Sequence, residues 1–414
     1  MISHYSVDIS PSAHPFRVTA DDDKNPPFRW GKWGILIMDY YFKTENLAVG
    51  YDGNILIHDI NVKLEKGKIL TLIGPNGAGK STILKSITRQ LETIQGTVYI
   101  NAQEIAAWSP KDMARQVAVV LTDRIRPELM TCAEVVAMGR YPYTNLFGKL
   151  TPKDTEAVQE ALERVHALDL ADQDFTTLSD GQRQRIMLAR AICQEPEIIV
   201  LDEPTAYLDI RHKIELLDIL REMAQKKNIT VIMSLHEIDL AMKISDYLLC
   251  VKGDTIEAFG PPDVILENHT IEHLYELHNG SYNLLFGSVE LTKPEGIPRV
   301  FVVAGGGYGI SCYRALQKQE IPFATGILFE NDVDCQVAKE LSSHVVVAPA
   351  FEAMTDAQFK EASNLLLRCE AVIDAGTPAG TFNQLNFKLL RLAEDHNIPV
   401  YRSKLTQEER VWKP

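Results

Sequence analysis

The chain has 414 residues, which is long for one domain, and its apolar and charged fractions are those of an ordinary globular protein. The net charge of −14 argues against a general nucleic-acid binder, and no apolar run approaches the roughly 18 residues of a membrane span. The six cysteines are scattered without a C-x-x-C pair, which indicates neither a zinc site nor a disulfide framework and predicts buried, reduced thiols.

Residues 1–37 are polar and Pro-rich without periodicity, which predicts a disordered extension. They also lack the basic-then-apolar pattern of a signal peptide, so we expect the chain to stay in the cytoplasm. The stretch "GKWG" ahead of Met38 would be encoded by G-rich codons resembling a ribosome-binding site. A second hypothesis is therefore that residues 1–37 are untranslated and that the natural start is Met38.

Two folded units are predicted after this extension, over residues 38–290 and 291–414. The first opens with short β-rich runs, is mostly helical over 124–180, and then alternates strands and helices up to a hairpin that turns at Gly253-Asp254. The second has five strand candidates separated by helices, after the linker "TKPEGIP". Alternating strands and helices predict α/β folds with parallel sheets covered on both faces.

The segment "GPNGAGKS", residues 74–81, matches the P-loop pattern G-x-x-x-x-G-K-S, follows an apolar strand and opens a helix. Its glycines let backbone N–H groups surround phosphates, and the helix N-terminus adds a positive dipole. We therefore expect Lys80 to reach the β- and γ-phosphates of ATP and Ser81 to ligate Mg²⁺.

Two acids end the apolar strand "IIVLDEP", residues 198–204, where buried carboxylates are costly unless they are used. Asp202 suits a water-mediated Mg²⁺ contact, and Glu203 suits a general base that takes a proton from the attacking water. His236 ends another apolar strand after an intervening helix. This position favours a contact with the γ-phosphate over a purely structural histidine.

Together with the segment "LSDGQRQR", residues 178–185, these motifs resemble, in their order, the ATPase subunit of an ABC transporter over residues 38 to about 290. The resemblance implies a P-loop NTPase cassette with a parallel-sheet core, an antiparallel β subdomain and a helical subdomain. It also implies a homodimer that encloses two ATP molecules, in which the signature segment of each subunit completes the partner's site.

The resemblance assigns nucleotide contacts to residues of four motifs. These are Tyr51, which stacks on adenine; Gly74, Asn76, Gly77, Gly79, Lys80, Ser81 and Thr82 in the phosphate loop; Ser179, Gly181 and Gln182 in the signature; and Asp209, with Leu208, in the loop that links the two sites. It also supports Mg²⁺ at Ser81 and Asp202, the catalytic base at Glu203 and a switch role for His236.

The chain departs from the family pattern at two positions. Thr122 stands where a Gln usually contacts Mg²⁺ and senses the permease. Its shorter hydroxyl is expected to contact Mg²⁺ through an extra water, and it puts the coupling role in doubt. Asp180 replaces the usual glycine of the signature. Ser179 and Gln182 have the spacing of a capping box, and an acid in a first helical turn is favourable by roughly 0.3–1 kcal/mol. We therefore expect Asp180 to face along its own helix and the site to remain competent.

A "GR-x-PY" segment within residues 139–143 resembles the importer branch that serves iron–siderophore, heme and cobalamin permeases, with a generic surface loop as the alternative. This resemblance implies an integral-membrane permease as partner, an external substrate-binding protein acting indirectly, and a peripheral position on the cytoplasmic face of the membrane. The cargo among these three stays open.

The second unit is predicted to be a smaller Rossmann-like α/β domain, because "VFVVAGGGYG" resembles a Rossmann turn and Glu330 ends the next strand. The G-x-G-x-x-G fingerprint nevertheless fails, since Ile310 holds the sixth position from Gly305. A second loop, "DAGTPAG" at residues 374–380, also follows a strand. We hypothesise a regulatory ligand site between the two loops, with a folded appendage that only packs or dimerises as the alternative.

Two other classes of function remain open beside the transport ATPase. One is a soluble ABC ATPase of translation or repair, against which stand the single P-loop and the lack of a long coiled coil. The other is a dinucleotide enzyme or ligand sensor that rests on the second unit alone.

Overall fold

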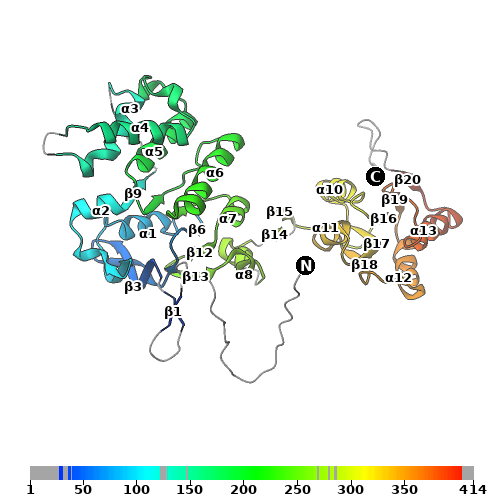
Figure 1. The fold of residues 1–414 in the computed structure, drawn as a ribbon. Helices are drawn as coiled ribbons and strands as arrows, with labels where there is room; N and C mark the ends of the chain where they lie inside the picture. The colour runs from blue at the N-terminus through cyan, green and yellow to red at the C-terminus, as the bar shows by residue number, and fades with distance from the viewer. Residues whose placement is uncertain are drawn as a thin grey trace, which may run out of the picture.

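The structure is a computed structural model that describes residues 28–30, 36–38, 40–121, 127, 129–145, 148–267, 270–277, 280–283 and 287–402. Figure 1 shows an α/β body from the blue to the green part of the chain and another from yellow to red. Thr122 lies outside the described residues, as does most of the predicted extension. Within that extension, β1 (Phe28–Trp30) pairs antiparallel with β2 (Leu36–Met38), where aromatic and branched residues that favour strands flank two glycines.

The core of the first body is a six-stranded sheet in the order β13-β12-β6-β11-β10-β9. The strands are β6 (Ile69–Ile73), β9 (Val117–Val120), β10 (Ile198–Leu201), β11 (Thr230–Ser234), β12 (Tyr247–Lys252) and β13 (Thr255–Gly260). All pairs are parallel except β12–β13, the hairpin predicted to turn at Gly253. The buried runs of Ile, Val and Leu in the parallel strands suit a sheet covered on both faces.

An antiparallel sheet covers one side of this core. It consists of β3 (Phe42–Tyr51), β4 (Asn54–Ile60), β7 (Gln95–Ile100) and β8 (Gln103–Glu104), with β5 (Lys63–Leu64) paired to β3. Its buried side chains form one hydrophobic cluster with α1 (Lys80–Ile87) and with β6 and β12 of the core sheet. The predicted antiparallel β part of the cassette is therefore present.

Helices form the other part of the first body, shown in cyan to green in Figure 1. They are α2 (Pro110–Gln116), α3 (Cys132–Ala137), the 3₁₀ segment η2 (Met138–Tyr143), α4 (Pro152–Arg164), α5 (Asp180–Cys193), α6 (Ile210–Lys227) and α7 (Ile238–Ile244). The buried faces of α3, α4 and α5 join those of α6 and the core strands in a single cluster. This arrangement agrees with the predicted helical part of an ABC cassette.

The second body is a five-stranded parallel sheet in the order β18-β17-β16-β19-β20. Its strands are β16 (Val300–Val303), β17 (Phe323–Phe329), β18 (His344–Ala348), β19 (Ala371–Asp374) and β20 (Val400–Arg402). One hydrophobic cluster packs α10 (Ile310–Lys318) and α11 (Val333–Leu341) on the sheet, and another packs α12 (Asp356–Leu366) and α13 (Gln384–Asp395). The strand order reverses between β16 and β19, as in doubly wound folds.

A hairpin that the sequence did not suggest lies between the two bodies along the chain. After α8 (Pro262–Glu267) and α9 (Thr270–Tyr275), β14 (Gly280–Asn283) pairs antiparallel with β15 (Ser288–Leu291). Tyr282 of this hairpin packs in the core of the first body. Glu290 accepts a 2.7 Å hydrogen bond from Arg314 of α10, so the hairpin contacts both bodies.

All six cysteines are buried and none of them forms a disulfide, as predicted. Among the described residues, none of the helices combines the length and the apolar character that a membrane span requires.

Candidate nucleotide-binding site

The predicted phosphate loop joins β6 to α1 at the carboxyl end of the core sheet. Its first residue, Gly74, has φ 148°, and a Cβ there would lie 2.1 Å from the carbonyl oxygen of Val251, so a side chain has no room. Gly79 caps α1 with φ 91°. The expected residues from Gly74 to Thr82 therefore form one strand–loop–helix turn, and the helix N-terminus favours an anion there.

Lys80 is the first residue of α1, and only 5% of it is exposed. Its Nζ donates hydrogen bonds to the carbonyl oxygens of Gly74 (2.7 Å) and Pro75 (2.9 Å), so the side chain folds back over its own loop. Burial lowers the pKa of Lys80, while the nearby carboxylates of Glu203 and Asp202 act in the opposite direction. Lysine and both acids therefore share one electrostatic site.

Two tyrosines from distant segments contact the phosphate loop and its helix. Tyr51, at the end of β3, is half exposed, and its hydroxyl lies 3.1 Å from Oγ1 of Thr82. This places the aromatic ring predicted to stack on adenine beside the start of α1. Tyr275 of α9 accepts a hydrogen bond from the Gly74 amide (3.1 Å), and burial raises the pKa of this phenol to about 12. Tyr275 carried no sequence signal, because its contact spans 201 residues.

Ser234, the last residue of β11, holds the two predicted acids. Its hydroxyl donates to Oδ1 of Asp202 (2.7 Å) and accepts a hydrogen bond from the Glu203 amide (2.9 Å). Asp202 is buried, with 5% of its surface exposed, at the end of β10, which pairs with β11. Sequence reasoning missed Ser234, although it lies two residues before His236 in "VIMSLHE" and so on the same sheet edge.

Glu203 and His236 are brought into direct contact. Nε2 of His236 lies 2.6 Å from Oε1 of Glu203, and both side chains are partly exposed, at 39% and 28%. Glu203 has φ 49°, an uncommon conformation for a residue that is not glycine and one that clusters at functional sites. The residues expected to act as base and switch thus form a pair beside Lys80.

The oxygen donors at this edge fit Mg²⁺. Ser81 follows Lys80 on α1, and Asp202 ends the strand two places from β6 in the sheet. Hydroxyl and carboxylate oxygens are the ligands that Mg²⁺ takes, and it usually keeps waters and substrate phosphates as its remaining ligands. No cluster of three or more acidic, His or Cys side chains suited to a metal occurs in the described part of the chain.

The signature segment opens α5 as the sequence predicted. Ser179 is the N-cap, its hydroxyl accepts the Gln182 amide hydrogen bond, and the Gln182 side chain accepts the Ser179 amide, which completes the capping box. Oδ1 of Asp180 pairs with Arg183 at 2.9 Å, one turn along the same helix. The acid thus faces its own helix, in agreement with the expectation.

The predicted linking loop contacts the signature within the same chain. Asp209 caps α6 by accepting the His212 amide hydrogen bond at 3.0 Å, and the same oxygen lies 2.8 Å from Nδ1 of the His212 ring. A Cβ added to Gly181 would lie 3.3 Å from Cγ of that ring. His212, which sequence reasoning missed, therefore connects Asp209 to the signature.

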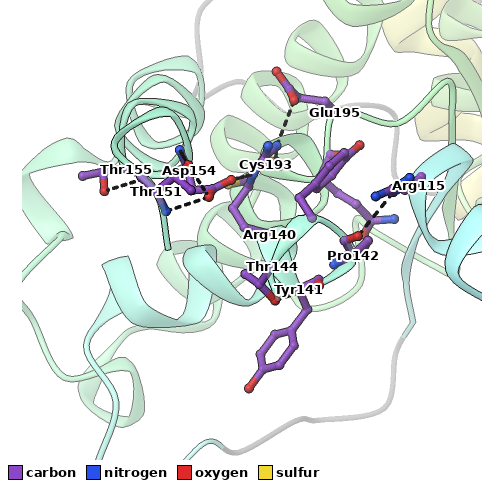
Figure 2. Close-up of polar contacts among 12 residues, drawn as sticks. Arg115, Arg140, Tyr141, Pro142, Thr144, Thr151, Asp154, Thr155, Cys193 and Glu195 are labelled. Carbon is purple, nitrogen blue, oxygen red and sulfur yellow. Dashed lines mark hydrogen bonds and ion pairs between the residues drawn. The ribbon is translucent and has the colours of Figure 1, made fainter. Parts of the chain in front are cut away.

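Arg140 of the "GR-x-PY" segment is the centre of an ion-pair network (Figure 2). Arg140 of η2 is 3% exposed and donates to Asp154 of α4 (2.9 Å), to Glu195 (2.9 Å) and to the carbonyl of Cys193, the last residue of α5 (2.8 Å). Its guanidinium also lies 4.1 Å from the ring centroid of Tyr143. Arg140 thus connects this segment to the C-terminal end of α5, the helix that begins with the signature.

Comparisons with known proteins agree with this geometry. The family model described as ABC transporter matches residues 57–206, and the model of the MJ0874 family matches residues 323–412. The uncharacterized ABC transporter ATP-binding protein MJ0873 of Methanocaldococcus jannaschii is 44% identical over 287 residues, which are 69% of this chain and 99% of that protein.

Two further relatives have named transport substrates. The iron(3+)-hydroxamate import ATP-binding protein FhuC of Bacillus subtilis is 36% identical, over 56% of this chain and 87% of its own. The cobalamin import ATP-binding protein BtuD of Halobacterium salinarum is 31% identical, over 75% and 79%. Among solved structures, an ABC transporter of metal-chelate type in an inward-facing conformation matches with a TM-score of 0.52 at 30% identity, over 57% of this chain and 90% of that chain.

Proposed function

Because the chain belongs to the ATP-binding proteins of ABC transporters, whose cassettes bind and hydrolyse ATP, we propose that it works as a homodimer that drives import of a metal chelate or cobalamin through a membrane permease. The observation that carries this proposal is the convergence of Lys80, Asp202 and the Glu203–His236 pair at one edge of the core sheet. A site with these groups is suited to phosphoryl transfer to water.

Within one subunit, each residue of the site has its own role in ATP hydrolysis. Lys80 leaves the carbonyls of Gly74 and Pro75 and turns its ammonium group to the β- and γ-phosphates. Ser81 and Asp202 hold Mg²⁺, which neutralises phosphate charge when it is bound. Glu203 accepts the proton of the attacking water, and His236, already paired with Glu203, orients the base and contacts the γ-phosphate.

A second subunit supplies what one chain lacks. Among the hydrogen bonds and ion pairs of the described residues, none joins Ser179, Gly181 or Gln182 to the phosphate loop. The hydroxyl and amides at the start of α5 are suited to an anion, because they lie at a helix N-terminus. We therefore assign them to the γ-phosphate bound by the partner subunit, and Asp209 to the contact between the two sites.

We infer the class of cargo from the relatives, because the nucleotide-binding site gives no information about it. Relatives that serve iron hydroxamates and cobalamin match the same cassette, and nothing in the nucleotide site contacts cargo. Selectivity then belongs to the permease and to an external binding protein. This proposal places the ATPase at the cytoplasmic face of the membrane through its permease.

Purification with the membrane partner tests the transport role. Tagged full-length Glu203→Gln protein, expressed in its native host, should co-purify with one integral-membrane protein. The parent ATPase, reconstituted with that membrane protein in proteoliposomes with ATP, should move a ferric hydroxamate, heme or cobalamin. Recovery of ATPase dimers from the cytosol without any membrane protein would contradict the transport role and favour a soluble ABC ATPase.

We expect Tyr51→Ala to raise the dissociation constant for ATP about tenfold, whereas Tyr51→Phe keeps it within about twofold. The reason is that base stacking on an aromatic ring contributes roughly 1–3 kcal/mol and does not need the hydroxyl. Calorimetric titration with ATP measures both constants. Equal losses in the two variants would show that the 3.1 Å contact with Thr82, not stacking, is what matters.

We expect Asp180→Gly to leave ATP hydrolysis within about threefold of the parent. The ion pair between Asp180 and Arg183 is partly exposed to solvent. Loss of this pair, together with loss of the negative charge at the start of α5, should lower the free energy of unfolding by about 1 kcal/mol or less. A hydrolysis assay and thermal unfolding check both values. Ser179→Ala is the matched control, and it should lower hydrolysis far more because it removes the capping hydroxyl. A large gain in rate for Asp180→Gly would show that the acid opposes phosphate binding.

A further inference from the structure

The second body has a pocket of about 280 Å³ where its strand order reverses. The pocket lies between the loop after β16 and the loop after β19, at the place hypothesised from the sequence for a ligand. Six of its side chains come from the ends of four different segments: Ile327, Phe329, Asp332, Met354, Thr377 and Phe382. Such a crevice outside the carboxyl ends of parallel strands is where open α/β sheets bind ligands.

The glycine loop beside this pocket already binds anions of its own chain. The Gly306 amide donates to Oδ2 of Asp332 at 2.7 Å, and the Gly309 amide donates to both carboxylate oxygens of Asp334, at 3.0 and 3.1 Å. Asp334 is fully buried. In a dinucleotide-binding fold these amides would face a pyrophosphate. The two aspartates stand in its place, so a phosphate would have to displace a buried carboxylate.

The charges around the pocket also disfavour an anion. The four loops at this edge, residues 304–309, 330–335, 349–355 and 375–383, contain four acids and no Lys or Arg. Arg402 of β20 pairs with Asp374 at 3.7 Å. An edge whose loops carry acids and no Lys or Arg disfavours phosphates and carboxylates and attracts cations.

Three other polar side chains of the pocket, those of Thr377, Asn383 and Asn386, already bond to the protein backbone. Asn386 accepts the Ile327 amide hydrogen bond and donates to the carbonyls of Ile327 and Ala304. Asn383 bonds within its own loop, and Thr377 donates to the carbonyl of Gly305. Asp332 accepts one hydrogen bond at each carboxylate oxygen, from the amides of Gly306 and Asp334, although a carboxylate accepts about four. This charged side chain of the pocket lining therefore has acceptor capacity left for a ligand.

We propose that this pocket binds a small organic cation with an apolar body, whose ammonium group pairs with Asp332. Phe329, Met354 and the largely exposed Phe382 supply apolar and aromatic walls, and aromatic faces attract organic cations. The volume lies at the lower end of the roughly 300–1,000 Å³ of small-molecule sites, which fits a single-ring amine and excludes a dinucleotide or a macrocyclic metal chelate.

Three probes of nearly one shape test the charge requirement on the full-length protein. Benzylammonium, benzyl alcohol and benzoate are titrated by ligand-observed NMR, with NADH as a fourth probe. We expect benzylammonium to bind with a dissociation constant below about 1 mM, and at least tenfold more tightly than either isostere. Stronger binding of benzoate or NADH, equal binding of all three isosteres, or no binding of benzylammonium would overturn the proposal.

Two variants locate the site. Asp332→Asn keeps one oxygen for the cap of α11 and gives up the bond from the Gly306 amide; since Asn is as good a cap as Asp, the fold should persist. It should weaken benzylammonium at least tenfold. Glu330→Gln removes an exposed acid at the same edge that does not line the pocket, and it should change binding less than twofold. Equal effects of the two variants would mean general attraction by charge, and would reject the site.

Discussion

Steady-state ATP hydrolysis by Glu203→Gln should fall by about 100- to 10,000-fold, while ATP affinity stays within about threefold of the parent. This fold-change is the usual contribution of a general base to the rate, and the amide of glutamine cannot accept the proton of the attacking water. Glutamine retains the shape of the side chain and an oxygen toward His236, which lies 2.6 Å from Glu203 in the parent. ATP should therefore bind without being cleaved, and the closed homodimer should accumulate. Light scattering with and without ATP, beside a hydrolysis assay, measures both effects.

Lys80→Ala is the matched control for that experiment. Lys80 is the buried cation of the phosphate loop, so its loss should weaken ATP binding itself and leave the protein monomeric with ATP. The two variants share a loss of hydrolysis and differ in dimer formation. If Glu203→Gln stays monomeric at saturating ATP, the site is not competent to close, and Asp180→Gly in the Glu203→Gln background then tests whether the signature acid is responsible.

Local patterns predicted much of this molecule because they report local geometry. The phosphate loop follows from glycines between an apolar strand and a helix, and the capping box at Ser179 follows from a spacing of three residues. Five strand candidates in the second unit became a parallel sheet, since each apolar run was followed by a helical one. The resemblance added roles that spacing alone could not supply, such as that of Tyr51.

What the sequence did not reveal are contacts between segments far apart in the chain. Ser234 fixes the acids of a neighbouring strand, Tyr275 reaches the phosphate loop from α9, and His212 stands between the linking loop and the signature. Each is an ordinary residue type at an ordinary position, and only the tertiary fold gives it a partner. The Rossmann-like loop shows the same limit, because its sequence resembled a Rossmann turn and the structure gives the amides of Gly306 and Gly309 to Asp332 and Asp334.

The hairpin β14–β15 bears on how the two bodies can communicate. Tyr282 belongs to the core of the first body, and a Cβ at Gly287 would lie 3.7 Å from the Cβ of Asp239 on α7, the helix that follows His236. From the same hairpin, Glu290 binds Arg314 of α10, whose helix begins at the glycine loop of the second body. A short chain of packed elements therefore connects the neighbourhood of His236 to that of the pocket in the second body.

Arg140→Met should lower the free energy of unfolding of the cassette by about 3–5 kcal/mol, the usual cost of removing one partner of a buried ion pair. Methionine fills a similar volume but leaves the buried carboxylate of Asp154 without its cation and the carbonyl of Cys193 without its donor (Figure 2). The loss should appear in the cassette's own urea transition. It should also appear as faster hydrogen exchange at the end of α5 and the start of α4. Arg211→Met is the matched control, because it breaks an ion pair with Glu215 of the same 2.9 Å length in which Arg211 is 81% exposed. This variant should lower the free energy of unfolding by less than about 1 kcal/mol.

The pH dependence of that difference separates the ion pair from packing. The Thr151 hydroxyl and amide, and then Arg140, hold the pKa of Asp154 down to about 2. A carboxyl with a depressed pKa contributes stability that is complete above its unfolded pKa of about 3.9 and is lost as the pH falls toward 2. Without Arg140 the pKa of Asp154 rises, so the stability gap between parent and variant should be constant above about pH 5 and narrow below pH 4. A gap that stays constant down to pH 2 would show that Arg140 acts through its packing on Tyr143 rather than through its charge.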